Sequence, residues 1–255
     1  LLRQFFSFFL QHYTGAEIIV ADNASGDQSV AILRQYFPQV RLIQLDDNYG
    51  FCGGYTRALK QVQADYYVLL NSDIEVTANW LTPMIQLLDS HPRIAAVQPK
   101  ILSFHHRTRF EHAGAGGGYV DSLGYPFCRG RIFDHIEEDT GQYNDELPVF
   151  WASGACMMIR SETFHAFGGF DEDFFAHMEE IDLCWKLHRA SQSIYYCGKS
   201  TIYHVGAGTL GYGNPRKVFL NFRNGLALIY KHFTTREILY KLPIRIFLDW
   251  VAASI

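Results

Sequence analysis

The sequence lacks the features that define several classes of protein. No stretch of 18 consecutive apolar residues occurs among the 255 residues, so none has the length and composition of a membrane-spanning helix. No block of like charge occurs either, and 26 acidic against 22 basic side chains leave a net charge of −4. This balance argues against a protein whose main task is to bind nucleic acid.

Cysteine is also scarce. The five cysteines are odd in number, and no two of them form a C-x-x-C pair. The spacing therefore indicates neither a disulfide framework nor a zinc knuckle, and we expect buried free thiols. What the chain has in quantity is apolar residues, 48% of the total, which excludes intrinsic disorder and predicts a sizeable core.

In the first hundred residues, apolar strand patterns alternate with helical patterns. We predict strands at 17–21, 40–45, 66–70 and 94–98, and helices at 29–37, 54–64 and 78–89. Strand and helix in alternation with short links predict a mostly parallel α/β sheet. In such sheets ligands bind at the carboxyl ends of the strands.

The second half has a different pattern. Residues 104–146 are long, polar and glycine-containing, which predicts an irregular segment that is either a functional loop or disordered. Beyond it we predict strands at 148–151, 155–160, 194–197 and 201–204, and helices at 178–190 and 215–232.

Polar clusters follow three of the predicted strands. Asp22 and Asp73 end two of them, where carboxylates suit a divalent ion that bridges phosphates, although a helix cap or an Asx turn is an equally ordinary role. The segment from Asn48 to Gly54 opens a helix with three glycines. Its backbone could approach an anion, or it could simply be a turn with a cap.

The helix expected at 178–190 begins with three acidic residues. Glu179 and Asp182 share one face of that helix, and Glu180 points about 100° away from Glu179. The cluster could offset the helix dipole, or it could supply a general base, because crowded carboxylates raise one another's pKa. His204 ends a short strand and could be structural or a metal ligand.

The tail from residue 238 to residue 255 predicts an amphipathic helix that either lies on a membrane or packs on its own domain. The predicted apolar side carries Leu239, Leu242, Ile246 and Trp250, widened by Leu248 and Val251, and the cations expected at its edge are Lys231, Arg236, Lys241 and Arg245.

The order of these motifs carries more information than any one of them. Asp-Asn-Ala-Ser, Asn-x-Gly-Phe-x-Gly-Gly and Asn-Ser-Asp follow successive strands, and a Ser-Gly-Ala strand, GGFDEDFF, an acidic helix and Tyr-His come after them. In this order, from about residue 17 to residue 232, the chain resembles the family-2 inverting glycosyltransferases of the GT-A fold, especially their bacterial rhamnosyltransferase-like branch. The resemblance implies an α/β fold of that type.

The resemblance also implies roles in donor binding. Asp22 matches the aspartate that contacts the nucleotide base, and Asn48 and Gly50 match the loop along the nucleoside. Asp73 matches the last acid of the metal and diphosphate motif, in which Asn71 stands where many relatives have an acid.

Further positions follow in the same way. Glu180 matches the catalytic base, and His204 matches a histidine that joins Asp73 in the metal site of some relatives. The residues that the resemblance places in the pocket for the donor sugar and acceptor are Trp151, Ser153, Gly154, Glu179 and Asp182.

The function implied is metal-assisted transfer, with inversion, of a sugar from a dTDP- or UDP-linked donor to a glycan or lipid-linked acceptor, using Mg²⁺ or Mn²⁺. We expect residues 1–100 to bind the nucleotide sugar, residues 101–214 to form the acceptor and catalytic half, and residues 215–255 to form helices. The expected location is the cytoplasm, at the cytoplasmic face of the inner membrane if the tail binds lipid. The alternatives are a non-catalytic nucleotide-sugar or glycan-binding domain and a nucleotidyltransferase.

Overall fold

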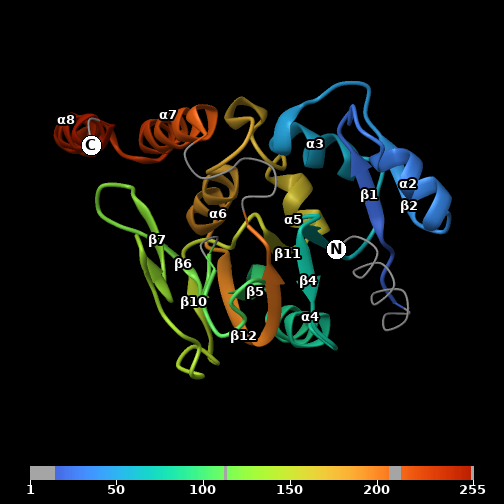
Figure 1. Ribbon diagram of the computed structural model, residues 1–255. Helices are drawn as coiled ribbons and strands as arrows, with labels where there is room; N and C mark the ends of the chain where they lie inside the picture. The colour runs from blue at the N-terminus through green and yellow to red at the C-terminus, as the bar shows by residue number, and fades with distance from the viewer. Residues whose placement is uncertain (1–14, 112–113, 207–213, 254–255) are drawn as a thin grey trace.

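A six-stranded sheet forms the centre of the computed structural model, which describes residues 15–111, 114–206 and 214–253 (Figure 1). The strands run in the order β10 (Glu146–Val149), β12 (Ser193–His204), β5 (Ile94–Ser103), β11 (Cys156–Arg160) and β3 (Tyr66–Leu70), and β4 (Ile74–Val76) pairs with the end of β12. The predicted strand at 66–70 is confirmed residue for residue, and those predicted at 194–197 and 201–204 are parts of one strand, β12.

Most strand pairs in this sheet are antiparallel, so the prediction of a mostly parallel sheet is wrong for it. β12 and β5 pair in parallel, but β10 with β12, β11 with β5, β11 with β3 and β4 with β12 are all antiparallel. Parallel neighbours need a long crossover, usually a helix. The described residues between β5 and β11 form short strands and no helix, and β11 runs antiparallel to β5.

Apolar side chains pack against both faces of the sheet. In β11, Met157 and Ile159 join the cluster that includes residues of α6 (Glu179–Arg189). Cys156 and Met158 alternate with them and join the cluster of α4 (Leu81–Ser90). This period of two is what a strand buried on both faces requires. All five cysteines are buried and free, which confirms the expectation for the thiols.

The first elements of the chain form a separate two-stranded sheet. β1 (Ile19–Asp22) and β2 (Arg41–Gln44) pair in parallel, and α2 (Ser29–Tyr36) buries Leu33 beside them. α3 (Gly50–Leu59) follows β2 and begins four residues before the predicted start. This parallel pair places the ends of β1 and β2, and the loops that follow them, side by side.

The segment expected to be irregular contains a second, four-stranded sheet, so that expectation is wrong. Its strands are β6 (Gly118–Val120), β7 (Pro126–Cys128), β8 (Arg131–Ile132) and β9 (His135–Ile136), all antiparallel. We call this sheet, together with the turns that connect its strands, the ribbon. Each strand has only two or three residues, too few to show a period in the sequence.

Two helices at one end of the molecule complete the fold (Figure 1). α7 (Pro215–His232) has the predicted bounds, because Pro215 begins it and the side chain of Asn214 accepts hydrogen bonds from two backbone N–H groups of its first turn.

α5 (Ser161–Ala166) and the short helix η1 (Glu172–Phe174) precede α6.

Two ionic side chains of α8 (Thr235–Ala253), those of Arg245 and Asp249, are buried against the protein. Arg245 Nε donates to Asp249 at 3.0 Å, both side chains are buried, and the hydroxyl of Tyr125 in the ribbon donates to Asp249 at 2.7 Å. Arg245 therefore does not lie at an exposed edge, which corrects the prediction for it. Lys231 is likewise paired with Asp171 and Asp182, at 2.6 and 2.7 Å.

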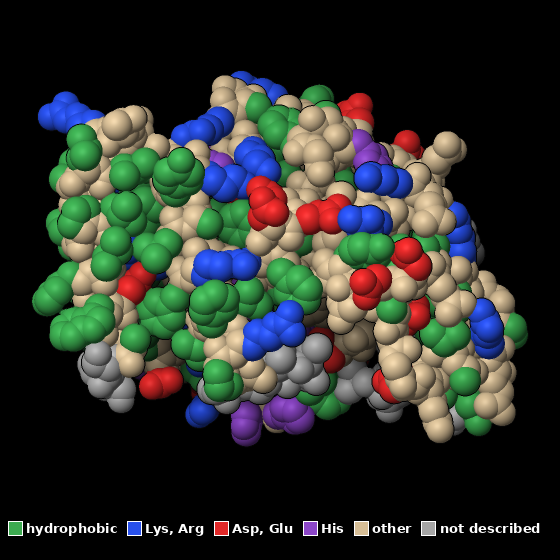
Figure 2. All heavy atoms as spheres, turned by 90° about the horizontal axis from the view of Figure 1, so that it is seen from above, with side chains coloured by type: hydrophobic (Ala, Val, Ile, Leu, Met, Phe, Trp, Pro, Cys, Tyr) green, Lys and Arg blue, Asp and Glu red, His purple; other side chains and the backbone are tan. Residues whose placement is uncertain are grey.

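The outward side of α8 is apolar. Figure 2 shows hydrophobic side chains gathered over the end of the molecule that carries this helix. We call the exposed residues the end patch: on α8 they are Leu239, Tyr240, Ile244, Ile246, Phe247, Leu248 and Trp250, and on the ribbon Phe127, Ile132 and Phe133. Within the described ranges, no helix has the length and hydropathy needed to cross a membrane.

Candidate active site

The antiparallel pairing of β4 with β12 brings two predicted metal ligands together. His204 pairs with Ile74, so Asp73, the residue before β4, lies beside the end of β12. Nε2 of His204 donates to Oδ1 of Asp73 at 3.2 Å, and the backbone N–H of Val205 donates to the Asp73 carbonyl at 3.0 Å. The sequence analysis predicted both residues, and the register explains why they meet.

A second acidic residue, Glu111, completes this cluster of three, and sequence reasoning missed it. Nδ1 of His204 donates to Oε2 of Glu111 at 3.1 Å, and both side chains are buried. Burial opposes the positive charge on His204, but the hydrogen bonds to Asp73 and Glu111 outweigh it and raise the pKa of His204 to about 9. Glu111 thereby fixes the ring so that Nε2 points at Asp73.

The donor set fits a hard divalent ion that a diphosphate helps to hold. Two ligands in neighbouring positions of an octahedral ion lie about 3 Å apart, and Oδ1 of Asp73 and Nε2 of His204 lie 3.2 Å apart. In the part of the chain that the structure describes, no group of three His, Cys, Asp or Glu side chains has the arrangement of a metal site. The two predicted ligands are Asp73 and His204, which would have to release the proton on Nε2 to bind an ion, and phosphate oxygens and water would supply the others.

The loops after β1 and β2 are joined by an asparagine that the sequence analysis did not select. Nδ2 of Asn23 donates to Oδ1 of Asn48 at 3.2 Å and to the carbonyl of Gly50 at 2.8 Å. Gly50 has a φ of 68°, and a Cβ there would lie 2.5 Å from the carbonyl oxygen of Phe175, so only glycine fits. Asp22 is buried and accepts a hydrogen bond from the backbone N–H of Ser25. This contact resembles the Asx turn that the sequence analysis gave as the alternative to a role in binding.

Asn71 connects this edge of the sheet to the acidic residues of α6. Its backbone N–H donates to the carbonyl of Ala155 at 3.0 Å. The neighbouring Gly154 lies against two carboxyl groups, since a Cβ on it would be 3.6 Å from Oε1 of Glu179 and 3.6 Å from Cδ of Glu180. A short series of contacts therefore runs from the strand end that carries Asp73 to the carboxyl groups at the start of α6.

Glu179 and Glu180 form a pair of enclosed carboxyl groups. Glu179 is 4% exposed, and Oε2 of each residue is buried without a hydrogen-bond partner among the described residues. Burial and the neighbouring charge of Glu180 raise the pKa of Glu179 well above its ordinary value. Burial also raises the pKa of Glu180, but backbone N–H groups that include those of Gly154 and Met178 act against this rise. Burial therefore favours the protonated form more strongly at Glu179 than at Glu180, whose carboxylate the backbone N–H groups stabilise.

Two residues expected to line the pocket, Trp151 and Ser153, have buried side chains. Trp151 is 7% exposed and its Nε1 donates to the carbonyl of Tyr119 at 2.8 Å. Ser153 is 1% exposed, and its backbone N–H donates to Oε1 of Gln98 at 2.9 Å. Both side chains are buried in these contacts, which corrects the prediction that Trp151 and Ser153 line the pocket.

Asp182 also lies away from the expected pocket. Its side chain is fully buried and pairs with Lys186 at 2.7 Å, Lys231 at 2.7 Å and His232 at 2.8 Å. The predicted helix face put it beside Glu179, but the basic groups of α6 and α7 enclose it. Asp182 is a structural carboxylate in this fold, which corrects its placement in the pocket.

Comparison of the sequence with known families decides the identity. The sequence model described as "Glycosyl transferase family 2" matches residues 1–168, well over half of the chain. The chain belongs to this family. The relationship that the order of the motifs indicated is thus confirmed.

Curated relatives of this glycosyltransferase support the same relationship. It is 26% identical over 209 residues to the N-acetylglucosaminyl-diphospho-decaprenol L-rhamnosyltransferase of Mycobacterium tuberculosis, covering 76% of this chain and 68% of the relative. It is 24% identical over 216 residues to the low-salt glycan biosynthesis hexosyltransferase Agl10 of Haloferax volcanii, covering 82% of this chain and 66% of the relative.

Solved structures confirm the GT-A fold. GalNAc-T7 with UDP, GalNAc and Mn²⁺ has a TM-score of 0.65 at 12% identity, covering 87% of this chain and 43% of that chain. The mannosyltransferase PcManGT from Pyrobaculum calidifontis, with GDP-Man and Mn²⁺, has a TM-score of 0.61 at 13% identity, covering 90% of this chain and 59% of that chain. The glycosyltransferase described here therefore spans less than two thirds of the length of either solved protein.

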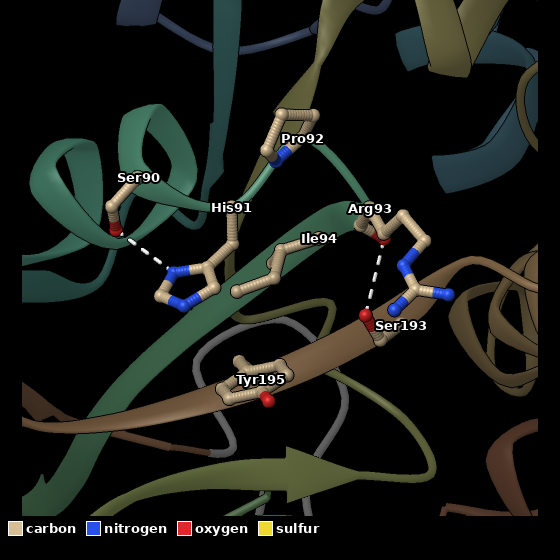
Figure 3. A pocket seen from close by; sticks show the side chains of 7 residues that line it. All are labelled: Ser90, His91, Pro92, Arg93, Ile94, Ser193 and Tyr195. Carbon is tan, nitrogen blue, oxygen red and sulfur yellow. Dashed lines mark hydrogen bonds between the residues drawn. The ribbon is translucent and has the colours of Figure 1, made fainter.

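A cavity of about 200 Å³ lies far from these residues (Figure 3). It is lined by Ser90, His91, Pro92, Arg93, Ile94, Ser193 and Tyr195. Ile94 begins β5 and Ser193 begins β12, whereas His204 ends β12. The cavity and the predicted metal ligands are thus at opposite ends of the same strands, and the cavity contains no residue of the candidate site.

Proposed function

We propose that this chain transfers a sugar from a nucleoside-diphosphate donor to a hydroxyl group of a glycan or lipid-linked acceptor, with inversion at the anomeric carbon. The observation that carries the proposal is the enclosed pair Glu179 and Glu180, linked through Gly154 and Ala155 to the strand end that bears Asp73. A carboxylate of raised pKa close to a diphosphate site is what a direct displacement on a nucleotide sugar requires.

The proposed reaction is a single displacement. Glu180 accepts the proton of the acceptor hydroxyl, whose oxygen bonds to the anomeric carbon as the bond from that carbon to the diphosphate oxygen breaks. Asp73 and His204 would hold Mg²⁺ or Mn²⁺. The ion, when bound, offsets the charge of the leaving diphosphate. Asn48 and Gly50 would contact the nucleoside, and Asp22 its base.

The proposed donor is dTDP-rhamnose, with UDP-sugars next. The rhamnosyltransferase relative from Mycobacterium tuberculosis supports a deoxyhexose, and its name indicates a lipid-linked acceptor. UDP and GDP-Man in the solved neighbours support binding of a nucleotide sugar in general.

Slow hydrolysis of the donor tests this function against a non-catalytic binding domain. We expect the full chain with Mn²⁺ to release free sugar from dTDP-rhamnose, or from UDP-N-acetylglucosamine or GDP-mannose in parallel reactions. The anomeric configuration of the first product, followed by NMR, should be inverted relative to the donor. Binding without release from any of these donors would favour the non-catalytic alternative, and retention would refute the single displacement.

Removal of the metal-binding carboxylate should weaken nucleotide binding only when metal is present. Loss of groups that merely orient a metal ligand typically costs about 10–100-fold in metal affinity, so we expect Asp73→Asn to cost at least as much in Mn²⁺-dependent affinity for the diphosphate. The matched variant Asp22→Asn should weaken binding equally with and without Mn²⁺. Isothermal titration measures both, and equal affinities of the unaltered chain with and without Mn²⁺ would contradict the metal assignment.

We further propose that the end patch contacts an anionic membrane that carries the acceptor. The apolar side chains of α8 face outward, and Arg236 is exposed on the same helix. Cations near an anionic surface contribute about 1 kcal/mol each. The polar contacts of Arg245 and Asp249 attach α8 to the protein and leave this apolar side uncovered by the described residues.

Liposome flotation tests the membrane proposal. Replacing Phe247 and Trp250 together with serine should weaken binding to anionic vesicles by roughly 3 kcal/mol, about 100-fold, because both side chains lose their apolar burial. Tyr36→Ser, which removes an aromatic ring 47% exposed on α2, is the control and should leave flotation unchanged. Equal flotation of all three proteins would show that the end patch does not bind the vesicles.

A further inference from the structure

The turn that leads into α6 has an unfavourable backbone. Phe175, His177 and Met178 have φ values of 64°, 71° and 72°. For residues other than glycine such conformations cost free energy and persist only where the surroundings impose them. This strained turn directly precedes Glu179 and Glu180, so whatever imposes it also sets the position of the two carboxyl groups.

A single buried side chain of α7 holds the turn. Asn224 is 1% exposed, and its Nδ2 donates to the carbonyl oxygens of Phe174, Ala176 and His177 at 3.0, 2.9 and 2.7 Å. Its Oδ1 accepts from Nε of Arg223 at 2.8 Å, which fixes the orientation of the amide. Three carbonyls from the four residues 174–177 thus converge on one amide.

Arg223 adds a weaker hold from the surface. Its Nη2 donates to the carbonyls of Asp173 and Phe174 at 2.8 Å each, and its side chain is exposed. Removal of this guanidinium leaves the core untouched. Substitution of Arg223 should therefore remove two hydrogen bonds to the turn without loss of the fold.

The turn also touches the loop proposed to bind the nucleoside. The backbone N–H of Cys52 donates to the carbonyl of Phe175 at 3.1 Å, and Gly50 lies so close to Phe175 that no Cβ fits. The turn therefore lies between the start of α3 and the start of α6, and Asn224 holds it from a third side.

We propose that Asn224 is a positioning residue that holds the turn so that the carboxylate of Glu180 stays directed at the acceptor. The proposal rests on the role of Glu180 as the base in the proposed function. It assigns to α7 a task that neither the sequence pattern nor the donor site reveals: this helix sets the geometry of the proton acceptor.

The pKa of Glu180 reports on this geometry. The backbone N–H of Met178, within the turn, is one of the groups that lower the pKa of Glu180 against the effect of burial. The titratable groups that face Glu180 are Glu179 of α6, Cys52 of α3 and Cys184 of α6. Asn224 carries no charge and is not among the groups that mainly shift the pKa of Glu180, so we expect its removal to change that pKa through the backbone of the turn.

The test compares Asn224→Ala and Arg223→Ala with Ile229→Ala. Ile229 is fully buried on α7 and packs near Gly124 of the ribbon, so its loss weakens the fold without touching the turn. The assay is hydrolysis of the fastest donor among dTDP-rhamnose, UDP-N-acetylglucosamine and GDP-mannose, followed against pH. Donor affinity and thermal midpoint are measured for each variant.

We expect Asn224→Ala to lower kcat on the order of 10–100-fold, the loss typical of a displaced catalytic group, with donor affinity nearly unchanged. The acid limb of its pH profile should move up by about one unit, as a carboxylate that loses a hydrogen bond ionises less readily. Arg223→Ala should move the profile in the same direction by less. Ile229→Ala should lower the thermal midpoint and leave the profile in place.

An unchanged profile in both Asn224→Ala and Arg223→Ala would overturn the proposal, and so would an equal shift in Ile229→Ala. If Asn224→Ala does not fold, Arg223→Ala alone decides by the same criterion. Glu180→Gln in the same assay distinguishes the role of Glu180 as base from the positioning role of Asn224. Full turnover in Glu180→Gln would refute the base itself, whereas an inactive Glu180→Gln beside an unshifted Asn224→Ala would refute only the positioning role.

Discussion

Glu180→Gln is expected to lower sugar transfer roughly 10²–10⁴-fold, the range typical for loss of a general base, while nucleotide binding stays close to that of the unaltered chain. Glutamine keeps the size of the side chain and one accepting oxygen but cannot accept the acceptor's proton. Steady-state transfer rates and isothermal titration with the nucleoside diphosphate measure the two quantities. The unaltered chain should lose activity as the pH falls through a value above the ordinary glutamate pKa of 4.5, because burial raises the pKa of Glu180.

Glu179→Gln is the matched control for this prediction. Burial and the charge of Glu180 raise the pKa of Glu179 and so favour its protonated form, which a neutral amide resembles. We expect a much smaller loss of activity, together with a lower pH for the acid limb, since glutamine removes any residual negative charge beside Glu180. A large loss in Glu179→Gln and none in Glu180→Gln would exchange the two roles.

The parts of the fold that could be predicted are those with strong local signals. β3 alternates between the two clusters it packs against, and Pro215 with the Asn214 cap begins α7 at the predicted residue. The ribbon could not be predicted, because strands of two or three residues carry no period. Its place is set instead by contacts such as the hydrogen bond from Trp151 to Tyr119, which joins residues 32 apart.

The same distinction holds for the candidate site. Asp73, Glu180 and His204 could be selected from the order of motifs along the chain. Glu111 and Asn224 could not, because each acts on groups far away in sequence: Glu111 on His204, 93 residues later, and Asn224 on carbonyls 47 to 50 residues earlier. Asp182 was misplaced for a related reason, since its partners Lys231 and His232 lie on a helix whose packing the local pattern does not encode.

Asp182 joins α6 to α7 through charge. Hydrogen bonds from His232, Lys186 and Lys231 outweigh the effect of burial and hold the pKa of Asp182 well below its ordinary value of 3.8. The ring of His232 also stacks on Trp185 at 4.9 Å between centroids, with planes 9° apart. A group whose pKa is lowered on folding stabilises the native state at every pH above its unfolded value.

Asp182→Asn should therefore destabilise the fold by about 3 kcal/mol at pH 7, the low end of the range for breaking a buried ion pair. For a chain of this size that corresponds to a fall of roughly 6–12 °C in Tm. The difference in stability between Asp182→Asn and the unaltered chain should decrease as the pH falls below about 4. In that range Asp182 is protonated in the unfolded unaltered chain but still ionised in the native state. Asp171→Asn, which removes a partly exposed partner of Lys231, should cost less. Thermal unfolding across pH measures all three proteins, and a folded Asp182→Asn variant with normal Tm but a raised donor KM would return Asp182 to the pocket.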